Sequence, residues 1–293
     1  MGEFDMKVFS SCHDAIQSCI DTQSFAIAHL YKTEKTMDMH IHNCHEIYYS
    51  ISGGKQFLIN DHLYDFEPGD IFFINHHESH CLSNLDNEIH ERIVLSIHPD
   101  FLQALSTEQT DLGYCFNFRE TGFSHRISLA SEEQKKFTYL IHRLSTSKDF
   151  GEEILDRSIF MELMCFLNKV FIKQCLNLDE ETTITNKHHE KVSAILSYIN
   201  QHLSDDLNIN SLAAEFFLSS SYLSAIFKKE TGTTIKKYIT SQRIALAKHL
   251  LSDGHSVTEA CDLCGFKDYS NFLKTFTKLV GISPKKYAQF SSQ

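Results

Sequence analysis

The stretch at 256–288, SVTEACDLCGFKDYSNFLKTFTKLVGISPKKYA, contains two short apolar-periodic segments separated by Gly265. Apolar residues three and four positions apart predict a helix before this glycine and another that includes Phe272 and Phe276. Gly281 ends the second helix, because glycine readily adopts the left-handed backbone conformation. Two short helices joined by a glycine-containing turn are typical of a helix-turn-helix, whose second helix can enter the major groove of DNA. The alternative interpretation is an ordinary amphipathic helical hairpin.

The pattern occurs a second time, 49 residues upstream. FKKETG at 227–232 aligns with FTKLVG at 276–281, and the same offset relates Tyr238 to Tyr287. The apolar-periodic run at 235–251 predicts a helix that holds the two units at a fixed separation. Packing alone does not explain such a duplication, so we expect two groove-reading units.

These residues resemble the AraC/XylS family of bacterial transcription regulators, over about the last hundred residues of the chain. The resemblance rests on LAA at 212–214, SYLSAIFKKETG at 221–232, RIALA at 243–247, GF at 265–266, Phe276, Gly281 and SP at 283–284. Cys261 departs from the usual alanine, and Thr277 from a usually basic position. The resemblance implies a sequence-specific DNA-binding regulator rather than an enzyme, with RNA polymerase as a further partner if it activates transcription.

Candidate DNA contacts lie on the exposed, N-terminal side of each second helix. They are Ser220, Ser221, Ser224, Ala225 and Lys228 in the first unit, and Lys267, Tyr269, Ser270, Lys274 and Lys278 in the second. The first set offers short hydroxyls and a methyl group, whereas Lys274 can reach guanine acceptors. We therefore expect the second unit to carry more of the base discrimination, with Lys278 contacting phosphate.

The charge is distributed unevenly along the chain. The formal net charge is −11, yet residues 187–293 contain 13 Lys and Arg against 9 Asp and Glu, and the remainder contains 14 against 29. Affinity for a polyanion is therefore confined to one part of the molecule. Because this part is only modestly basic, one copy is expected to bind DNA weakly.

The length of 293 residues predicts more than one domain. No run approaches the ~20 apolar residues of a membrane span, and the N-terminus lacks the layout of a signal peptide, so we expect a cytoplasmic protein that does not bind membranes. Its nine cysteines are then expected to be free thiols. Cys261 and Cys264 fit small core residues better than a redox motif.

The sequence pattern of residues 24–97 predicts a small β-barrel or jelly roll. Short β-branched or aromatic runs at 25–31, 46–51, 56–59, 71–74 and 89–97 alternate with turn signals such as SGG at 52–54 and PGD at 68–70. We predict an α+β chain, with an effector-binding barrel at 1–130, a helical dimerisation and relay segment at 131–176, a linker at 177–186 and a DNA-binding domain at 187–293.

A histidine-rich pattern lies within this barrel. His40-x-His42-x3-Glu46-x6-Gly53 is followed by Gly69-x10-His80-x3-Asn84. The two segments resemble the two motifs of the cupin family, although Glu34, Asn75 and His77 replace the usual glycine and proline residues. The resemblance implies that His40, His42, Glu46 and His80 bind one divalent transition metal, such as zinc, nickel, manganese or iron(II). The alternative is a metal-free barrel whose histidines bind a sugar or one another.

The same barrel is expected to hold a small polar effector, such as a polyol or sugar. Alternate residues of a strand share a face, so His40, His42, Glu46, Tyr48 and His80 are expected to point inward as its polar contacts. Apolar walls are expected from Phe57, Phe66 and Phe72. The neighbouring His45, His76 and His77 are expected to line the barrel mouth.

Two helices are predicted between barrel and linker. SEE at 131–133 is a good helix start, and a second helix carries Ile154, Leu155, Ile159, Leu163, Phe166, Leu167, Val170 and Phe171. This is more apolar surface than one face of a helix needs, which favours a homodimer. Three other functions stay open: a metal-dependent cupin enzyme tethered to DNA, a sensor of the metal itself, and an oligomerisation module without effector control.

Overall fold

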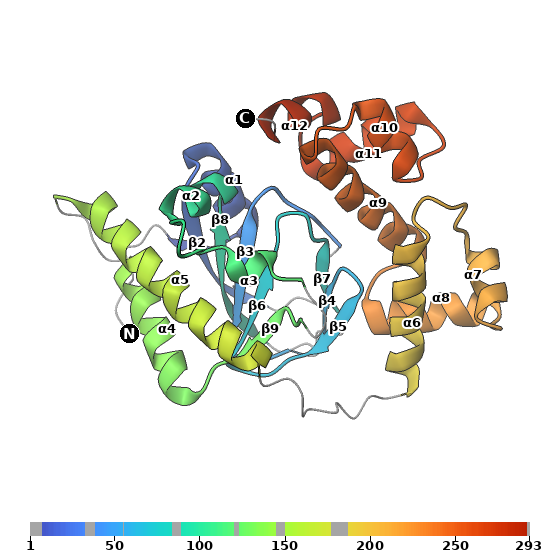
Figure 1. Ribbon diagram of the computed structural model, residues 1–293. Helices are drawn as coiled ribbons and strands as arrows, with labels where there is room; N and C mark the ends of the chain where they lie inside the picture. Colours follow the sequence, from blue (N-terminus) through green and yellow to red (C-terminus); the bar gives the residue numbers. More distant parts are fainter. Residues whose placement is uncertain are drawn as a thin grey trace.

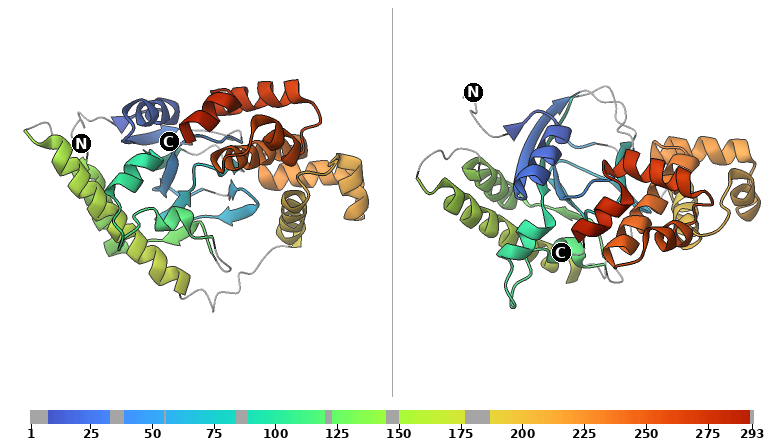
Figure 2. Two further views of the ribbon diagram at one scale, coloured as in Figure 1. Left: turned by 45° about the horizontal axis from the view of Figure 1, so that its top comes forward. Right: turned by 90° about the horizontal axis from the view of Figure 1, so that it is seen from above.

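The computed structural model describes residues 8–32, 39–54, 56–83, 89–119, 123–144, 150–176 and 187–291. It is an α+β structure, as predicted, with a sheet-rich N-terminal part and a helical C-terminal part (Figures 1 and 2). Glu34, Asn84 and the predicted linker at 177–186 lie outside the described residues. None of the described helices is both long and apolar enough to cross a membrane.

Two sheets form the N-terminal barrel. The six-stranded sheet has the order β1 (Val8–Phe9), β2 (Phe25–Lys32), β8 (His90–Ile97), β3 (His45–Ser50), β6 (Asp70–Ile74) and β9 (Arg126–Ser128). The three-stranded sheet has the order β5 (His62–Asp65), β4 (Gln56–Ile59) and β7 (His80–Ser83). The neighbouring strands pair antiparallel, except that β1 is parallel to β2.

The central strands of the large sheet, β8, β3 and β6, are buried on both faces, so their alternating side chains enter two different cores. Tyr48 and Phe72 point between the sheets, whereas Ile47 and Phe73 point to the opposite face. That outer face is covered by α4 (Ser131–Leu144) and α5 (Glu152–Leu176), which Figure 1 shows along one side of the barrel. Three further helices, which we did not predict, complete this part: α1 (Cys12–Thr22), α2 (Pro99–Leu105) and α3 (Tyr114–Asn117).

The C-terminal part contains both predicted helix-turn-helix units. Its helices are α6 (Lys187–Gln201), α7 (Ile209–Glu215), α8 (Ser220–Thr231), α9 (Ile235–Ser252), α10 (Val257–Leu263), α11 (Tyr269–Val280) and α12 (Pro284–Ser291). Gly232 and Gly281 end α8 and α11 in the left-handed conformation. Cys261 and Cys264 are buried free thiols, as predicted, whereas Leu263, an apolar residue of α10 between them, is 49% exposed.

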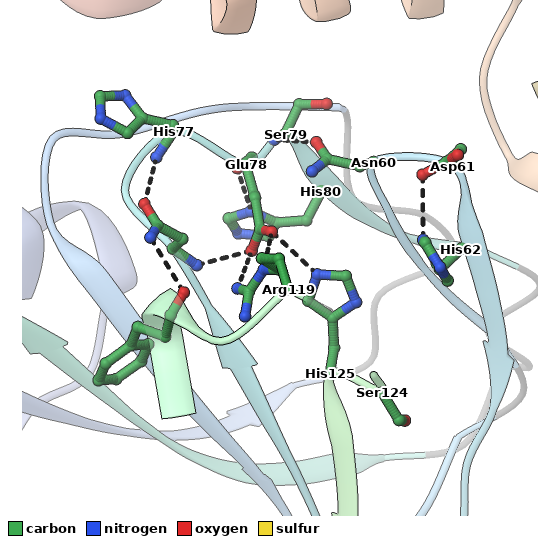
Figure 3. A network of polar contacts seen from close by, with 12 residues as sticks. Asn60, Asp61, His62, His77, Glu78, Ser79, His80, Arg119, Ser124 and His125 are labelled. Atoms are coloured by element: carbon green, nitrogen blue, oxygen red, sulfur yellow. Dashed lines mark hydrogen bonds and ion pairs between the residues drawn. The ribbon is translucent and has the colours of Figure 1, made fainter. Parts of the chain in front are cut away.

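A buried ionic network holds the loop before β7. Glu78 accepts hydrogen bonds from Arg119 Nε at 2.8 Å and Nη2 at 2.9 Å, and its Oε1 lies 3.1 Å from His125 Nε2 (Figure 3). Burial opposes the charge of Glu78, but His125 and Arg119 hold the pKa of its carboxyl far below the ordinary value. The network therefore ties the segment that leads into His80 to the loop before β9.

Substitution of Gly265 tests whether the turn of the second helix-turn-helix has room for a side chain. Its φ is +81°, and an added Cβ would lie 2.3 Å from the carbonyl oxygen of Leu203. Gly254 has a similar φ of +88° but open space around its Cβ position. Gly254→Ala should therefore cost about 1–2 kcal/mol of backbone strain, and Gly265→Ala should cost distinctly more. Chemical denaturation of both variants measures this, and equal losses would contradict the steric argument.

Substitution of Arg119 tests how much the ionic network around Glu78 contributes to stability. Removing one partner of a buried ion pair leaves an uncompensated charge, so Arg119→Met should lower the free energy of unfolding by about 3 kcal/mol. Arg143 is the matched control, because its pair with Glu162 spans 3.8 Å between half-exposed side chains. Arg143→Met should change stability by less than about 1 kcal/mol. Denaturant titration that finds the same small loss for both would show that the network does not hold Glu78.

Candidate functional site

Three histidines converge at one end of the barrel. The ring centroids of His40 and His80 lie 4.2 Å apart, those of His42 and His80 5.0 Å apart, and those of His40 and His42 5.8 Å apart. A possible ligand nitrogen from each ring lies within 4.8 Å of the others. The strand predicted through His40 and His42 was wrong, since His40 forms only an isolated bridge with His80. The bridge nevertheless brings the two segments together.

Backbone carbonyls orient two of these rings. His42 Nδ1 lies 2.8 Å from the carbonyl oxygen of Cys44, and His80 Nδ1 lies 3.3 Å from that of Glu78. A carbonyl oxygen only accepts, so each Nδ1 must carry the proton. Nε2 of each ring is thereby left to face the site, which is the orientation that such contacts also give to metal-binding histidines.

Both Nε2 atoms face the carboxylate of Glu46. Its Oε2 lies 2.9 Å from His42 Nε2 and 3.7 Å from His80 Nε2. Burial opposes the charge of Glu46, but His80 and His42 hold the pKa of its carboxyl well below the ordinary value. Among the described residues, His80 Nε2 is buried without a hydrogen-bond partner. Burial opposes the charge of His42, but Cys44 and Glu46 raise its pKa to about 9, so without a metal its Nε2 carries a proton and donates to Glu46. A bound cation would take the place of this proton.

This donor set fits a divalent transition metal. Imidazole nitrogen and carboxylate oxygen bind zinc at about 2.0–2.2 Å, and the same ligands suit iron, nickel and manganese. His40, His42, Glu46 and His80 would hold the ion, which would supply positive charge to the buried carboxylate and an open position for a further ligand. The site arises where the bridge of His40 to His80 meets the start of β3.

Tyr48 points into the barrel, as predicted, and lies in a cluster of aromatic rings. Its ring packs against Phe57, Phe66 and Phe72, with centroid distances of 5.0, 6.1 and 6.2 Å. These four side chains are at most 3% exposed. They contact one another in the core between the two sheets, and their role as walls of an effector site stays a prediction. Aromatic rings that pack edge to face fill this space.

A second group of histidines lies beside the site. Burial lowers the pKa of His45 and of His77 to about 3, so both rings are neutral. The ring of His76 lies 4.7 Å from that of His45 and 3.7 Å from that of His77. The ring of His77 lies 5.8 Å from that of His249 on α9. The predicted mouth of the barrel is thus covered by a helix of the C-terminal part.

Two residues of this covering helix were missed in the sequence. Lys248 is fully buried and donates to the carbonyl oxygens of His42, at 2.8 Å, and His76. Gln242 donates to Ser79 Oγ at 3.1 Å. Burial lowers the pKa of Lys248 to about 7. A lysine within the buried stripe between Ile244 and Leu251 was the available signal, because a charge there interrupts the apolar period.

The candidate DNA contacts lie on a different surface. All ten are exposed, except that Ser220 is half-buried and donates to Asn210 Oδ1 at 2.9 Å. Lys267 forms an ion pair of 2.7 Å with the exposed Asp206. Each unit thus presents the start of its second helix to solvent, as insertion into a major groove requires. Tyr222, which we did not single out, is 42% exposed on α8 beside this set.

Two families of known proteins match two separate parts of the chain. Residues 23–164 match the AraC-like ligand binding domain family, and residues 212–289 match a helix-turn-helix domain family. A probable transcriptional regulator LumQ from Photobacterium leiognathi is 28% identical over 275 residues, which cover 92% of this chain and 98% of that protein. The HTH-type transcriptional activator RhaS of Escherichia coli is 24% identical over 257 residues, covering 85% and 87%.

Solved structures with a similar fold include ToxT from Vibrio cholerae and the C-terminal domain of AraT from Geobacillus stearothermophilus. ToxT is 16% identical with a TM-score of 0.39, covering 92% of this chain and 100% of that chain. The AraT domain is 28% identical with a TM-score of 0.34, covering 36% and 88%. On the two family matches and the regulators that align along nearly its whole length, the chain belongs to the AraC family of DNA-binding transcription regulators, with an N-terminal ligand-binding domain.

Proposed function

We propose that this regulator changes its DNA binding in response to a divalent transition metal held by His40, His42, Glu46 and His80. The observation that supports the proposal is that His42 and His80 both direct Nε2 towards the buried carboxylate of Glu46, with a possible ligand nitrogen of His40 close by. Three imidazoles beside one buried carboxylate are a donor set typical of transition-metal sites. A small polar effector, such as a polyol or sugar, remains a prediction, as a ligand that completes the coordination of the metal.

DNA recognition is proposed to use the exposed starts of α8 and α11. Helix α9 has 18 residues, which span about 27 Å at ~1.5 Å per residue. This is somewhat less than the ~34 Å between successive major-groove faces. The two units can therefore occupy adjacent turns if they splay outward or if the DNA bends, which gives a footprint of about two turns for each chain.

A homodimer through α5 is part of the proposal. Ile154, Met161, Cys165 and Ile172 recur at spacings of seven, four and seven and therefore share one face of the helix. Ile154 is 64% and Ile172 41% exposed, whereas Met161 and Cys165 between them are half-buried and also pack against the core beneath the helix. An apolar stripe on a helix that already covers the barrel is suited to a second copy of the chain. If the regulator activates transcription, RNA polymerase is its further partner.

Glu46 and His80 test the sensing site. Glu46→Ala and His80→Ala should abolish the change in DNA affinity on adding Zn²⁺, Ni²⁺ or Mn²⁺, while metal-free DNA binding stays near that of the parent. The measurement is fluorescence anisotropy on an operator selected from a random library, with and without metal and with a panel of sugars. His13→Ala, an exposed histidine of α1, is the control. Parental responses in both site variants would remove the barrel from the sensing role.

Lys274 tests base reading by the second unit. Lys274→Ala should cost about 1–3 kcal/mol on the selected operator, because a base contact is lost, and much less on random DNA. Lys285→Ala on α12 should instead weaken both complexes alike, as expected for a phosphate contact. Both sets of affinities are compared at one salt concentration. An equal loss on random DNA for Lys274→Ala would reassign Lys274 to phosphate.

A further inference from the structure

The outer face of the three-stranded sheet is buried against the DNA-binding domain. Leu58 and Cys81, which point away from the barrel interior, belong to one apolar cluster with Phe227 and Tyr238. Ile41, between two of the candidate ligands, packs in a second cluster with residues of α9 and its neighbours. Figures 1 and 2 show α9 running alongside this end of the barrel. The two domains thus share a continuous contact.

Two buried polar contacts join α9 to the segments that carry the candidate ligands. Lys248 Nζ donates to the carbonyl oxygens of His42 and His76, and Gln242 Nε2 donates to Ser79 Oγ. His42 is itself a candidate ligand, and Ser79 directly precedes His80 (Figure 3). The position of these ligands and the docking of α9 therefore depend on the same contacts.

We propose that Lys248 and Gln242 are positioning residues of the ligand site, and that occupation of this site is thermodynamically coupled to the docking of α9. The inference rests on the proposed metal site and names the route by which its occupation reaches the DNA-binding domain. The coupling is reciprocal, because two binding equilibria that share a conformational change must influence each other equally.

The energetics favour a contact that a ligand can shift. The ammonium group of Lys248 is buried, and its acceptors among the described residues are two neutral carbonyl oxygens. Burial of a charge without a carboxylate partner costs free energy, which offsets part of the gain from the apolar contact. The docked arrangement is consequently less stable than its apolar area alone would make it.

Docking controls orientation rather than access. In the docked arrangement the candidate base-reading residues, among them Ser224 on α8 and Lys274 on α11, are exposed. Helix α9 contacts both helix-turn-helix units through the clusters that contain Tyr238 and Ile244. The contact with the barrel therefore sets how the two units are presented, and release of α9 would change their presentation without unmasking them.

The test measures the affinity of the full-length chain for Co²⁺, which reports its ligands through visible absorption. Lys248→Met should weaken Co²⁺ binding by about tenfold, within the usual range of coupling between sites, because His42 loses the donor that fixes its backbone. Lys236→Met is the matched control, since Lys236 is exposed on the same helix, and it should bind Co²⁺ as the parent does. Hydrogen exchange of α9 should change on adding Co²⁺ to the parent but not to Lys248→Met.

Ser79→Ala removes the acceptor of Gln242 from the barrel side and carries the test if Lys248→Met does not fold. It should weaken Co²⁺ binding in the same direction and reduce the response of α9. If the parental chain does not bind Co²⁺, both the proposed metal site and this inference are overturned. Parental affinity and parental exchange in both Lys248→Met and Ser79→Ala would overturn the coupling alone and leave the metal site intact.

Discussion

Burial of the three-stranded sheet on both faces is the constraint on which the arrangement of the molecule depends. Its inner face packs against the rings of Tyr48 and Phe72, and its outer face, which includes Leu58 and Cys81, is covered by helices of the DNA-binding domain. A small sheet with two apolar faces is stable only if other elements bury both of them, because apolar surface left in water costs about 25 cal/mol per Å². The domains therefore meet at this sheet, and the candidate ligands lie at its edge.

The buried carboxylate of Glu46 gives the site its chemistry. A carboxylate removed from water is costly unless charged or hydrogen-bonding partners surround it. Here the partners are the imidazoles of His42 and His80, which backbone carbonyls orient so that Nε2 of each ring faces the carboxylate. The buried carboxylate of Glu78 is stabilised differently, by hydrogen bonds from the permanently charged guanidinium of Arg119. The first arrangement accommodates a cation, whereas the second supplies one permanently.

Much of the fold could be predicted because it rests on local periodicity. The duplicated helix-turn-helix follows from the 3.6-residue period with glycines at the helix ends, and Gly232 and Gly281 indeed adopt positive φ. The strands follow from alternation. Helices α1, α2 and α3 were not predicted, since their few apolar residues are buried by neighbours distant in the chain. The aromatic walls assigned to a cavity were recognised as inward-facing, but whether inward-facing rings enclose space depends on the partners they meet.

The sequence by itself determined the two recognition units, the barrel and the set of four candidate ligands, because each is encoded by residue type at fixed spacing. Only the tertiary structure decided that His42 and His80 turn towards Glu46, since the carbonyls that orient them belong to Cys44 and Glu78. It also decided that Lys248 is buried against His42, a contact between residues 206 positions apart. Sequence spacing cannot predict this contact, because the packing of the whole molecule decides whether two segments so far apart in the chain meet.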